Sequence, residues 1–154
     1  MNERERIKQA AAAKEEEYQE SARRLREFVT VATFSDNDLQ RIVRAAHRTS
    51  TAAPWPLIRE QTPSDACYIL LSGEAAVYVG QDRVAVVGPG EVIGESSLRR
   101  GKLRNATVTT TGKAEVLRVA RDDLDRLLNE IPALRGIMDA TVARHMPGGT
   151  IDSS

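Results

Sequence analysis

The sequence contains one cysteine, Cys67, and only two histidines, His47 and His145, which lie far apart along the chain. A single cysteine excludes an internal disulfide and a cysteine-built zinc site. Two distant histidines also disfavour a histidine metal centre. We therefore expect a protein that uses neither a metal nor a cofactor.

The chain also lacks net charge and long apolar runs. Its 22 basic and 22 acidic residues cancel, so no bulk charge favours nucleic acid as a partner. No segment approaches the roughly 20 apolar residues that a membrane span requires, and the first thirty residues are rich in Glu, Lys and Arg. We predict a cytoplasmic protein that does not enter the membrane.

What the chain does contain fits one globular domain with appendages. Its 154 residues are 41% hydrophobic and 29% charged, which is ordinary for such a protein. We divide it into a charged N-terminal helix over residues 1–28, a domain over residues 29–146 and a disordered tail over residues 147–154.

The first segment has neither glycine nor proline from Asn2 to Phe28 and is rich in strong helix formers. Its apolar face is thin, and only the second half, with Tyr18, Ala22 and Leu25, carries a stripe that can be buried. A solvated helix docked at one end is the favoured interpretation. The alternative is a helix that binds a protein partner or forms a homodimer.

Helical signals flank a central β region. In "FSDNDLQRIVRAAH", Ser35 can cap a helix, Asp38 can complete a capping box, and Phe34 can pack on Leu39. From Trp55 to residue 120, short apolar runs alternate with turn residues at the spacing of antiparallel strands in a barrel or sandwich. Residues 121–145 return to helical spacing, interrupted at Pro132.

Several isolated features have ordinary structural interpretations. The cluster of Asp122, Asp123 and Asp125 is expected to cap a helix and to complement its dipole. Cys67 and Tyr68 fall in a predicted strand and are expected in the core. Trp55, which lies between two prolines, is expected to pack rather than to stack on a base.

The loop "GESSLRRGKLRNATV", residues 94–108, carries the chemistry. Gly94 allows the backbone to approach a ligand, and the next residues can form one helical turn whose free amides face an anion. Arg104 adds a planar fork that matches phosphate oxygens. A lone acid beside a phosphate must point elsewhere, so Glu95 is expected to accept a hydrogen bond from a sugar hydroxyl. A sugar phosphate is the implied ligand.

This loop resembles the phosphate-binding cassette of cyclic nucleotide-binding domains, which occur in bacterial catabolite-activator-type regulators and in protein kinase regulatory subunits. The family pattern, Gly-Glu-x-[Ala/Ser]-Leu and then Arg-x-Ala-[Thr/Ser]-Val, matches without a gap. "YILLSGEAAVY", "VVGPGEVIGE" and "LIREQTPSDACYIL" also resemble the family, over about residues 34–145. The resemblance implies a mainly β fold, a cupin-like antiparallel β-barrel (jelly roll) with flanking N-terminal and C-terminal helices.

The resemblance also implies roles for single residues. Arg104 would pair with the cyclic phosphate, and Glu95 would hold the ribose 2′-OH. Backbone amides would come from Gly94 near the ribose and from Ser97 and Asn105 at the phosphate, while apolar members would form the pocket wall. A helix within residues 133–145 would cap the base. The complete predicted ligand site comprises Gly94, Glu95, Ser96, Ser97, Leu98, Arg104, Asn105, Ala106, Thr107 and Val77.

The cassette departs from the family at a few positions. Leu103 replaces a common proline, and Arg99 and Arg100 replace residues that are commonly apolar. Asn105 occupies the position where some members carry a Ser or Thr associated with cyclic GMP and others an Ala associated with cyclic AMP. We favour cyclic AMP over cyclic GMP.

The predicted function is therefore a cyclic nucleotide sensor that couples binding to helix rearrangement and is not an enzyme, since no catalytic constellation is evident. The alternative is a degenerate member that binds no ligand and serves as an interaction or dimerisation module. A nucleic-acid patch is disfavoured because no aromatics interleave with the cassette cations and no DNA-binding domain follows the barrel.

Overall fold

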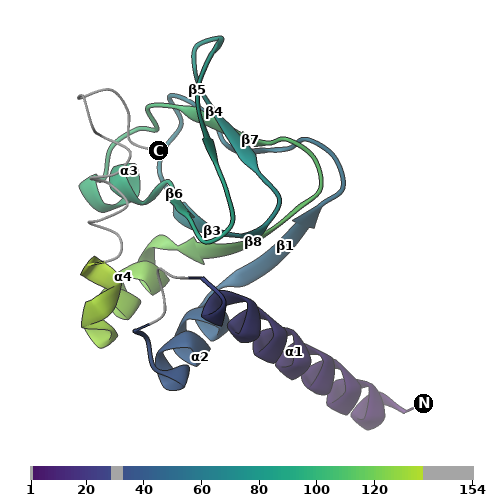
Figure 1. Cartoon of the computed structure of the whole chain (residues 1–154). Coiled ribbons are helices and arrows are strands. Elements are labelled where there is room, and N and C mark those ends of the chain that lie inside the picture. Colours follow the sequence, from purple (N-terminus) through teal and green to yellow (C-terminus); the bar gives the residue numbers. More distant parts are fainter. Residues whose placement is uncertain (1, 29–32, 137–154) are drawn as a thin grey trace.

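The computed structural model describes residues 2–28 and 33–136, with the backbone alone for residues 96, 97 and 99. Most of the helical structure lies at one end of the molecule, and a β structure with a short helix beside it forms the rest (Figure 1). The elements in chain order are α1 (Glu3–Arg26), α2 (Asp36–Ala45), β1 (His47–Thr51), β2 (Pro56–Ile58), β3 (Ala66–Ser72), β4 (Ala75–Val79), β5 (Asp82–Val87), β6 (Val92–Ile93), α3 (Glu95–Arg100), β7 (Thr107–Thr110), β8 (Ala114–Ala120) and α4 (Arg121–Glu130).

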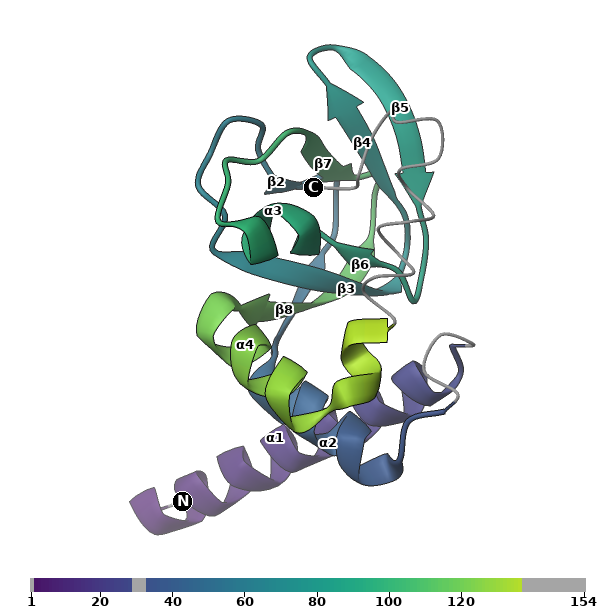
Figure 2. The ribbon, with the colours of Figure 1, turned by 90° about the vertical axis from the view of Figure 1, so that its left-hand side faces the viewer.

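The strands form two four-stranded antiparallel sheets, with orders β1-β8-β3-β6 and β2-β7-β4-β5. Helices α1, α2 and α4 lie on the outer side of the first sheet, whereas α3 lies beside the barrel (Figure 2). The predicted jelly roll with flanking helices is thereby confirmed.

Strands β3 and β8 separate two hydrophobic clusters. Ile69 pairs with Leu117 and Leu70 pairs with Val116 across the two strands. Because side chains alternate between the faces of a strand, Ile69 and Leu117 belong to the cluster under the helices, whereas Leu70 and Val116 belong to the cluster inside the barrel. One pair of strands therefore supports both cores.

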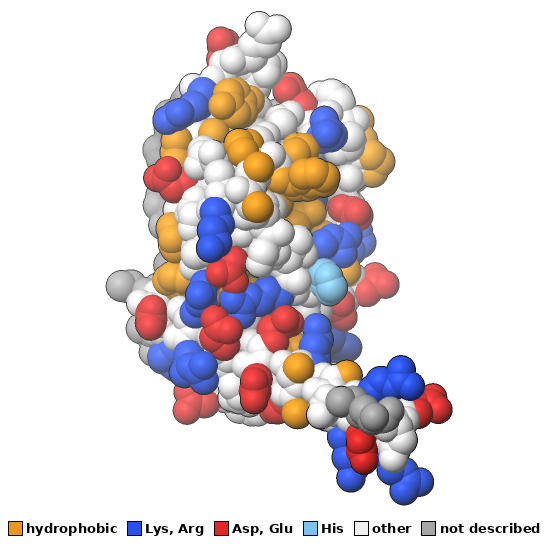
Figure 3. Space-filling view, turned by 90° about the vertical axis from the view of Figure 1, so that its right-hand side faces the viewer, with side chains coloured by type: hydrophobic (Ala, Val, Ile, Leu, Met, Phe, Trp, Pro, Cys, Tyr) orange, Lys and Arg blue, Asp and Glu red, His pale blue; other side chains and the backbone are white. Residues whose placement is uncertain are grey.

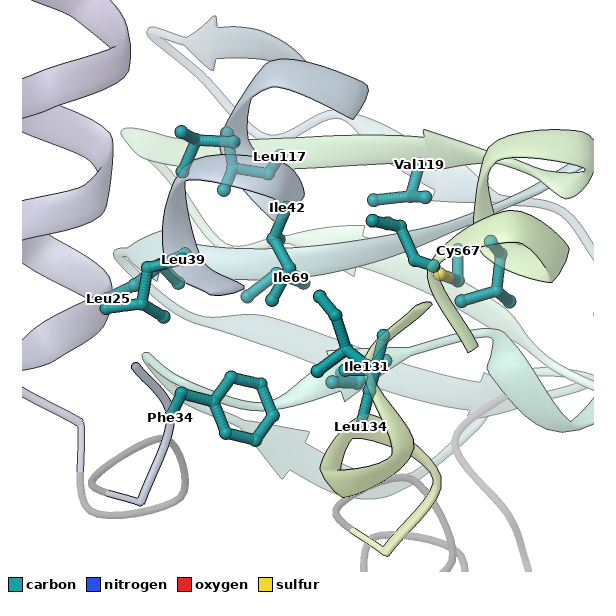
Figure 4. Close-up of a cluster of buried hydrophobic side chains, with 14 of the residues drawn as sticks. Leu25, Phe34, Leu39, Ile42, Cys67, Ile69, Leu117, Val119, Ile131 and Leu134 are labelled. Atoms are coloured by element: carbon teal, nitrogen blue, oxygen red, sulfur yellow. The ribbon is translucent and has the colours of Figure 1, made fainter. Parts of the chain in front are cut away.

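The first cluster, here called the helical-side core, is built mainly from large aliphatic side chains (Figure 4). Side chains from α1, α2, α4 and the first sheet meet in it, which fixes the helices against the barrel. The residues labelled in Figure 4 are Leu25, Phe34, Leu39, Ile42, Cys67, Ile69, Leu117, Val119, Ile131 and Leu134.

Helix α1 docks through its second half, as predicted. Its buried residues are Ser21, Ala22 and Leu25, whereas residues 3–16 are all exposed. Ile7 in the free half is 63% exposed. In Figure 3 the charged side chains gather over the helices, and the hydrophobic ones gather over the barrel.

The predicted start of α2 is confirmed. The Ser35 hydroxyl accepts from the Asp38 backbone N–H at 3.0 Å, and the Asp38 carboxylate accepts from the Ser35 N–H at 3.3 Å. This capping box satisfies two of the amides that a helix leaves without an internal partner. Phe34 and Leu39 are both buried in the helical-side core.

Strand β1 was not predicted, because its sequence HRTST has no apolar alternation. It lies at the edge of the first sheet and is mostly exposed, and its register against β8 runs from His47–Arg118 to Thr51–Ala114. The strand exists because β8 supplies hydrogen-bonding partners, a long-range contact that a local pattern does not reveal.

Two interpretations of single features were wrong. Trp55 is 60% exposed rather than packed, because it precedes the short edge strand β2. The aspartates near residue 122 do not cap α4, since strand β8 runs directly into the helix and leaves Ala120 at the cap position without a side-chain hydrogen bond. Asp122 and Asp123 do lie in the first turn, where they complement the helix dipole.

The other interpretations fare as follows. Cys67 is fully buried, and burial raises the pKa of its thiol to about 12, while Tyr68 is partly buried against the barrel interior. Helical structure resumes at Pro132 and continues to residue 136. The predicted tail and most of the predicted base-capping helix fall outside the described residues, and the division into domains stays a prediction.

Candidate functional site

The predicted cassette connects β6 to β7 through the short helix α3. Gly94 directly follows β6 and has a φ of +82°, a backbone conformation that residues other than glycine rarely adopt. A Cβ atom at this position would lie 2.6 Å from Ile58 Cδ1 and 2.7 Å from Arg104 Nη1. Both the backbone angle and the space therefore require glycine at the entrance to α3.

Arg104 is the central charged residue of the cassette and is only 2% exposed. Its Nη1 donates to the Gly94 carbonyl at 2.6 Å, its Nη2 donates to the Ala66 carbonyl, and the Asp65 carboxylate lies 4.0 Å from Nη2. Burial lowers the pKa of the guanidinium, and Asp65 acts in the opposite direction. An arginine still keeps its charge, so the site holds a largely desolvated cation.

The backbone around Arg104 is fixed by the loop before β3. The Arg104 N–H donates to the Thr62 carbonyl at 2.9 Å, and the Arg104 carbonyl accepts from the Gln61 N–H at 2.8 Å. Gln61 is the one non-glycine residue with positive φ, at 66°, in the part of the chain that the structure describes. These two backbone hydrogen bonds fix the position of the Arg104 main chain, from which the side chain extends to the guanidinium.

Glu95 is the first residue of α3 and is 2% exposed. An acid at this position is favoured by the positive end of the helix dipole. Both cassette charges act on the nearby Cys67 thiol: after burial, which is the main cause of its raised pKa, Glu95 raises that pKa further and Arg104 lowers it. Glu95 and Arg104 therefore lie around the same stretch of β3.

The structure divides the predicted apolar wall between the two cores. Val77 and Ala106 are fully buried in the barrel interior, whereas Leu98 of α3 is buried in the helical-side core. Leu98 thus connects the cassette with the helices. Thr107 is partly buried, and its hydroxyl accepts from the Glu60 N–H at 3.0 Å.

The remaining predicted residues are placed by their backbone or by exposure. Ser96 and Ser97 are the second and third residues of α3, where backbone amides lack intrahelical partners. Asn105 is exposed. A hollow of 280 Å³ opens beside Arg104, bordered by residues 56–59 of the β2 region, by Asp65 and by Tyr68.

Arg121, the first residue of α4, was missed by sequence reasoning. Its Nη1 donates to the Leu98 carbonyl at 2.9 Å and its Nη2 to the Ser64 carbonyl at 2.6 Å. The Ser64 hydroxyl in turn donates to the Lys102 carbonyl at 2.6 Å. A cation at the positive end of a helix is unfavourable, and this conflict was the signal that could have identified Arg121.

Other kinds of site find no support in residues 2–28 and 33–136. Over these ranges, no three His, Cys, Asp or Glu side chains form a group that could hold a metal ion. No helix within them has the length and apolar character to cross a membrane.

Comparison with known proteins identifies the class to which this fold and cassette belong. The profile of the family described as "Cyclic nucleotide-binding domain" matches residues 55–131, which is half of the chain. The chain belongs to the cyclic nucleotide-binding domain family. The profile includes the whole cassette and all of α4.

Individual relatives cover different shares of the chain. A cGMP-dependent protein kinase of Eimeria tenella is 35% identical over 75 residues, 49% of this chain and 8% of the kinase. A cAMP-dependent protein kinase regulatory subunit of Hypocrea atroviridis is 27% identical over 110 residues, 71% of this chain and 24% of the subunit. The chain thus matches less than a quarter of the length of either relative.

A structure described as "Sp-2Cl-cAMPS bound to PKAR CBD2" superimposes with a TM-score of 0.75 at 19% identity, covering 87% of this chain and 90% of that one. At this identity the likeness shows the fold. Because it covers 87% of this chain, the structural match extends beyond residues 55–131 that the family profile covers.

Proposed function

We propose that this protein is a non-catalytic regulatory module that binds a cyclic nucleotide, with cyclic AMP favoured over cyclic GMP. The observation that carries the proposal is the buried Arg104 guanidinium of a complete cassette, which donates to the Gly94 carbonyl on one side and to the Ala66 carbonyl on the other. A desolvated cation with spare N–H donors favours an anionic ligand.

In the proposed complex, the cyclic phosphate pairs with Arg104 and accepts from the backbone amides of Ser97 and Asn105. The two observed bonds to carbonyls use two of the five N–H donors of a guanidinium, so phosphate can join them or replace them. Glu95 accepts from the ribose 2′-OH, and Val77 and Ala106 line the interior wall.

Binding would shift a population rather than create a new state. The ligand stabilises the conformation in which the cassette and the terminal helix close over it, by its differential affinity for that conformation. Helix α1 is the proposed output surface, since residues 3–16 are exposed and available to a protein partner or a second copy of the chain.

Isothermal titration calorimetry with cyclic AMP and cyclic GMP tests the proposal. We expect saturable binding, tighter for cyclic AMP, and a loss of about 2–4 kcal/mol in Arg104→Ala, because the variant removes one partner of a desolvated charge pair. Arg100→Ala is the matched control: it removes an exposed cassette arginine and should change affinity little.

The second candidate is a module that binds no ligand. It is favoured by the contacts that already engage Arg104, and by Leu103, which stands where the family often has proline and is 54% exposed. Absence of heat with either nucleotide, from protein whose folding is confirmed by circular dichroism, would support this candidate. Equal affinity in the Arg104→Ala variant would refute the assigned pocket.

A further inference from the structure

Two arginines hold opposite ends of the cassette helix α3. Arg104 donates to the Gly94 carbonyl, directly before the helix, and Arg121 donates to the Leu98 carbonyl near its C-terminal end. The Leu98 carbonyl also accepts from the Gly101 N–H at 3.3 Å, and a cation is favourable at the C-terminal end of a helix because of the helix dipole. The first arginine lies at the proposed phosphate site and the second opens α4.

Arg121 also fixes the loop that holds Arg104. Its second guanidinium nitrogen donates to the Ser64 carbonyl, and its own backbone N–H donates to the Asp65 carbonyl at 3.1 Å. The Ser64 hydroxyl reaches back to Lys102 in the cassette. The three hydrogen bonds of Arg121 therefore tie α4 to both segments that surround the cassette, α3 and the loop before β3.

The position of Arg121 is costly for α4 itself. The helix begins with no side-chain cap, and a cation lies where its dipole is positive. Asp122 and Asp123 in the same turn offset part of this cost. Arg121 is unfavourable for the dipole of its own helix but connects two neighbouring segments. We therefore expect its role to lie in the contacts between elements rather than in the stability of α4.

We propose that Arg121 is a positioning residue that transmits cassette occupancy to α4. When phosphate binds Arg104, the contact of Arg104 with the Gly94 carbonyl changes and the Gly94 end of α3 moves. The Leu98 carbonyl moves with the short helix. Because Arg121 is hydrogen-bonded to that carbonyl, the start of α4 is displaced as well. This inference rests on the proposed function, since it assigns the coupling path of the same ligand site.

Arg121→Met tests the path, because methionine keeps most of the length and removes the two guanidinium bonds. Arg126→Met is the matched control on the same helix, because the Arg126 side chain is 57% exposed and pairs with Asp123, three residues earlier on α4 itself. The measurements are cyclic AMP affinity by calorimetry and hydrogen exchange of the α4 amides, with and without cyclic AMP.

In the wild type and in Arg126→Met, we expect cyclic AMP to slow exchange in α4 by about fivefold or more, the lower end of ordinary allosteric coupling. In Arg121→Met, we expect affinity within a few-fold of wild type but most of this protection lost. Equal protection of α4 in Arg121→Met would overturn the proposal, as would equal loss in the control variant.

A ligand-free arm separates failure of the inference from failure of the proposed function. Gly94→Ala displaces α3 directly, since the added Cβ overlaps Ile58 and Arg104. Exchange in α4 should respond to Gly94→Ala when Arg121 is present and not in the double variant with Arg121→Met. If the protein binds no nucleotide but α4 responds to Gly94→Ala only when Arg121 is present, the coupling through Arg121 is supported and the proposed sensor function is refuted. If α4 responds equally in both backgrounds, the coupling through Arg121 is refuted.

Discussion

The helical-side core and the barrel interior are built from different side chains, although they share strands β3 and β8. The helical-side core is filled mainly with Leu, Ile and Phe, whereas the barrel interior consists largely of Ala and Val. The buried charges Glu95 and Arg104 lie at the cassette beside the barrel.

The difference in side-chain size indicates that the two cores serve different purposes, one for stability and one for ligand binding. Large side chains bury more apolar area each and so contribute more to the free energy of folding. Small side chains leave space near the cassette, and the Arg104 guanidinium there is stabilised by backbone carbonyls rather than by close apolar packing. We infer that the helices stabilise the domain while the barrel interior is adapted to a polar ligand.

The largest expected effect comes from neighbouring residues of β8 that face the two cores. Leu117→Ala should reduce the free energy of unfolding by about 2–5 kcal/mol, since it leaves a large cavity in the helical-side core. Val116→Ala should cost about 1–2 kcal/mol, because fewer methyl groups are removed. Urea denaturation measures both. An equal or larger loss in Val116→Ala would mean that the barrel interior is packed as tightly as the helical side.

A smaller effect is expected at the cassette entrance. Gly94→Ala should cost about 1–3 kcal/mol of stability, because alanine is strained at a φ of +82° and its Cβ overlaps Ile58 and Arg104. It should also weaken cyclic nucleotide binding. Gly101→Ala is the control, since Gly101 shares positive φ but a Cβ there meets no atom within 4 Å. Similar nucleotide affinities in the two variants would argue against displacement of Arg104.

The smallest effect concerns pH and the charged contacts between α1 and the first sheet. Glu115 on β8 accepts from Arg48 on β1 and from Arg24 on α1, the latter at 3.1 Å. The hydrogen bond from Arg48 is the main cause that holds the pKa of Glu115 below its usual 4.5. A carboxyl with a lowered pKa contributes stability above its usual pKa and loses it as the pH falls through the folded value.

Denaturation at pH 7 and at pH 3.5 should therefore show a smaller loss of stability on acidification in Glu115→Gln than in the wild type. Glu74→Gln is the control, because it removes one carboxylate at an exposed position in the turn between β3 and β4. If Glu115→Gln and wild type lose equal stability in acid, the contact between α1 and the sheet contributes nothing that depends on Glu115 ionisation. That result would leave apolar packing as the attachment of α1.

Local sequence determined much of the fold, because the signals for these elements are local. The capping box at Ser35, the helix over residues 3–26 and the alternation in β3 and β8 each depend on residues a few positions apart. The cassette was readable for the same reason, since its glycine, acid and arginine lie within eleven consecutive residues. The roles assigned to those residues stay predictions until a ligand is titrated.

Only the tertiary structure decided the features that depend on distant partners. Strand β1 has no pattern of its own and forms because β8 lies beside it. Arg104 is buried because Ala66 and Gly94 supply carbonyls around it, although an arginine before a strand is by itself expected in solvent. Arg121 joins Leu98 and Ser64, 23 and 57 residues away, so no local rule could assign its contacts. The residue types of the cassette determine which chemistry is available there, and the tertiary structure decides which charges are desolvated and which helix they contact.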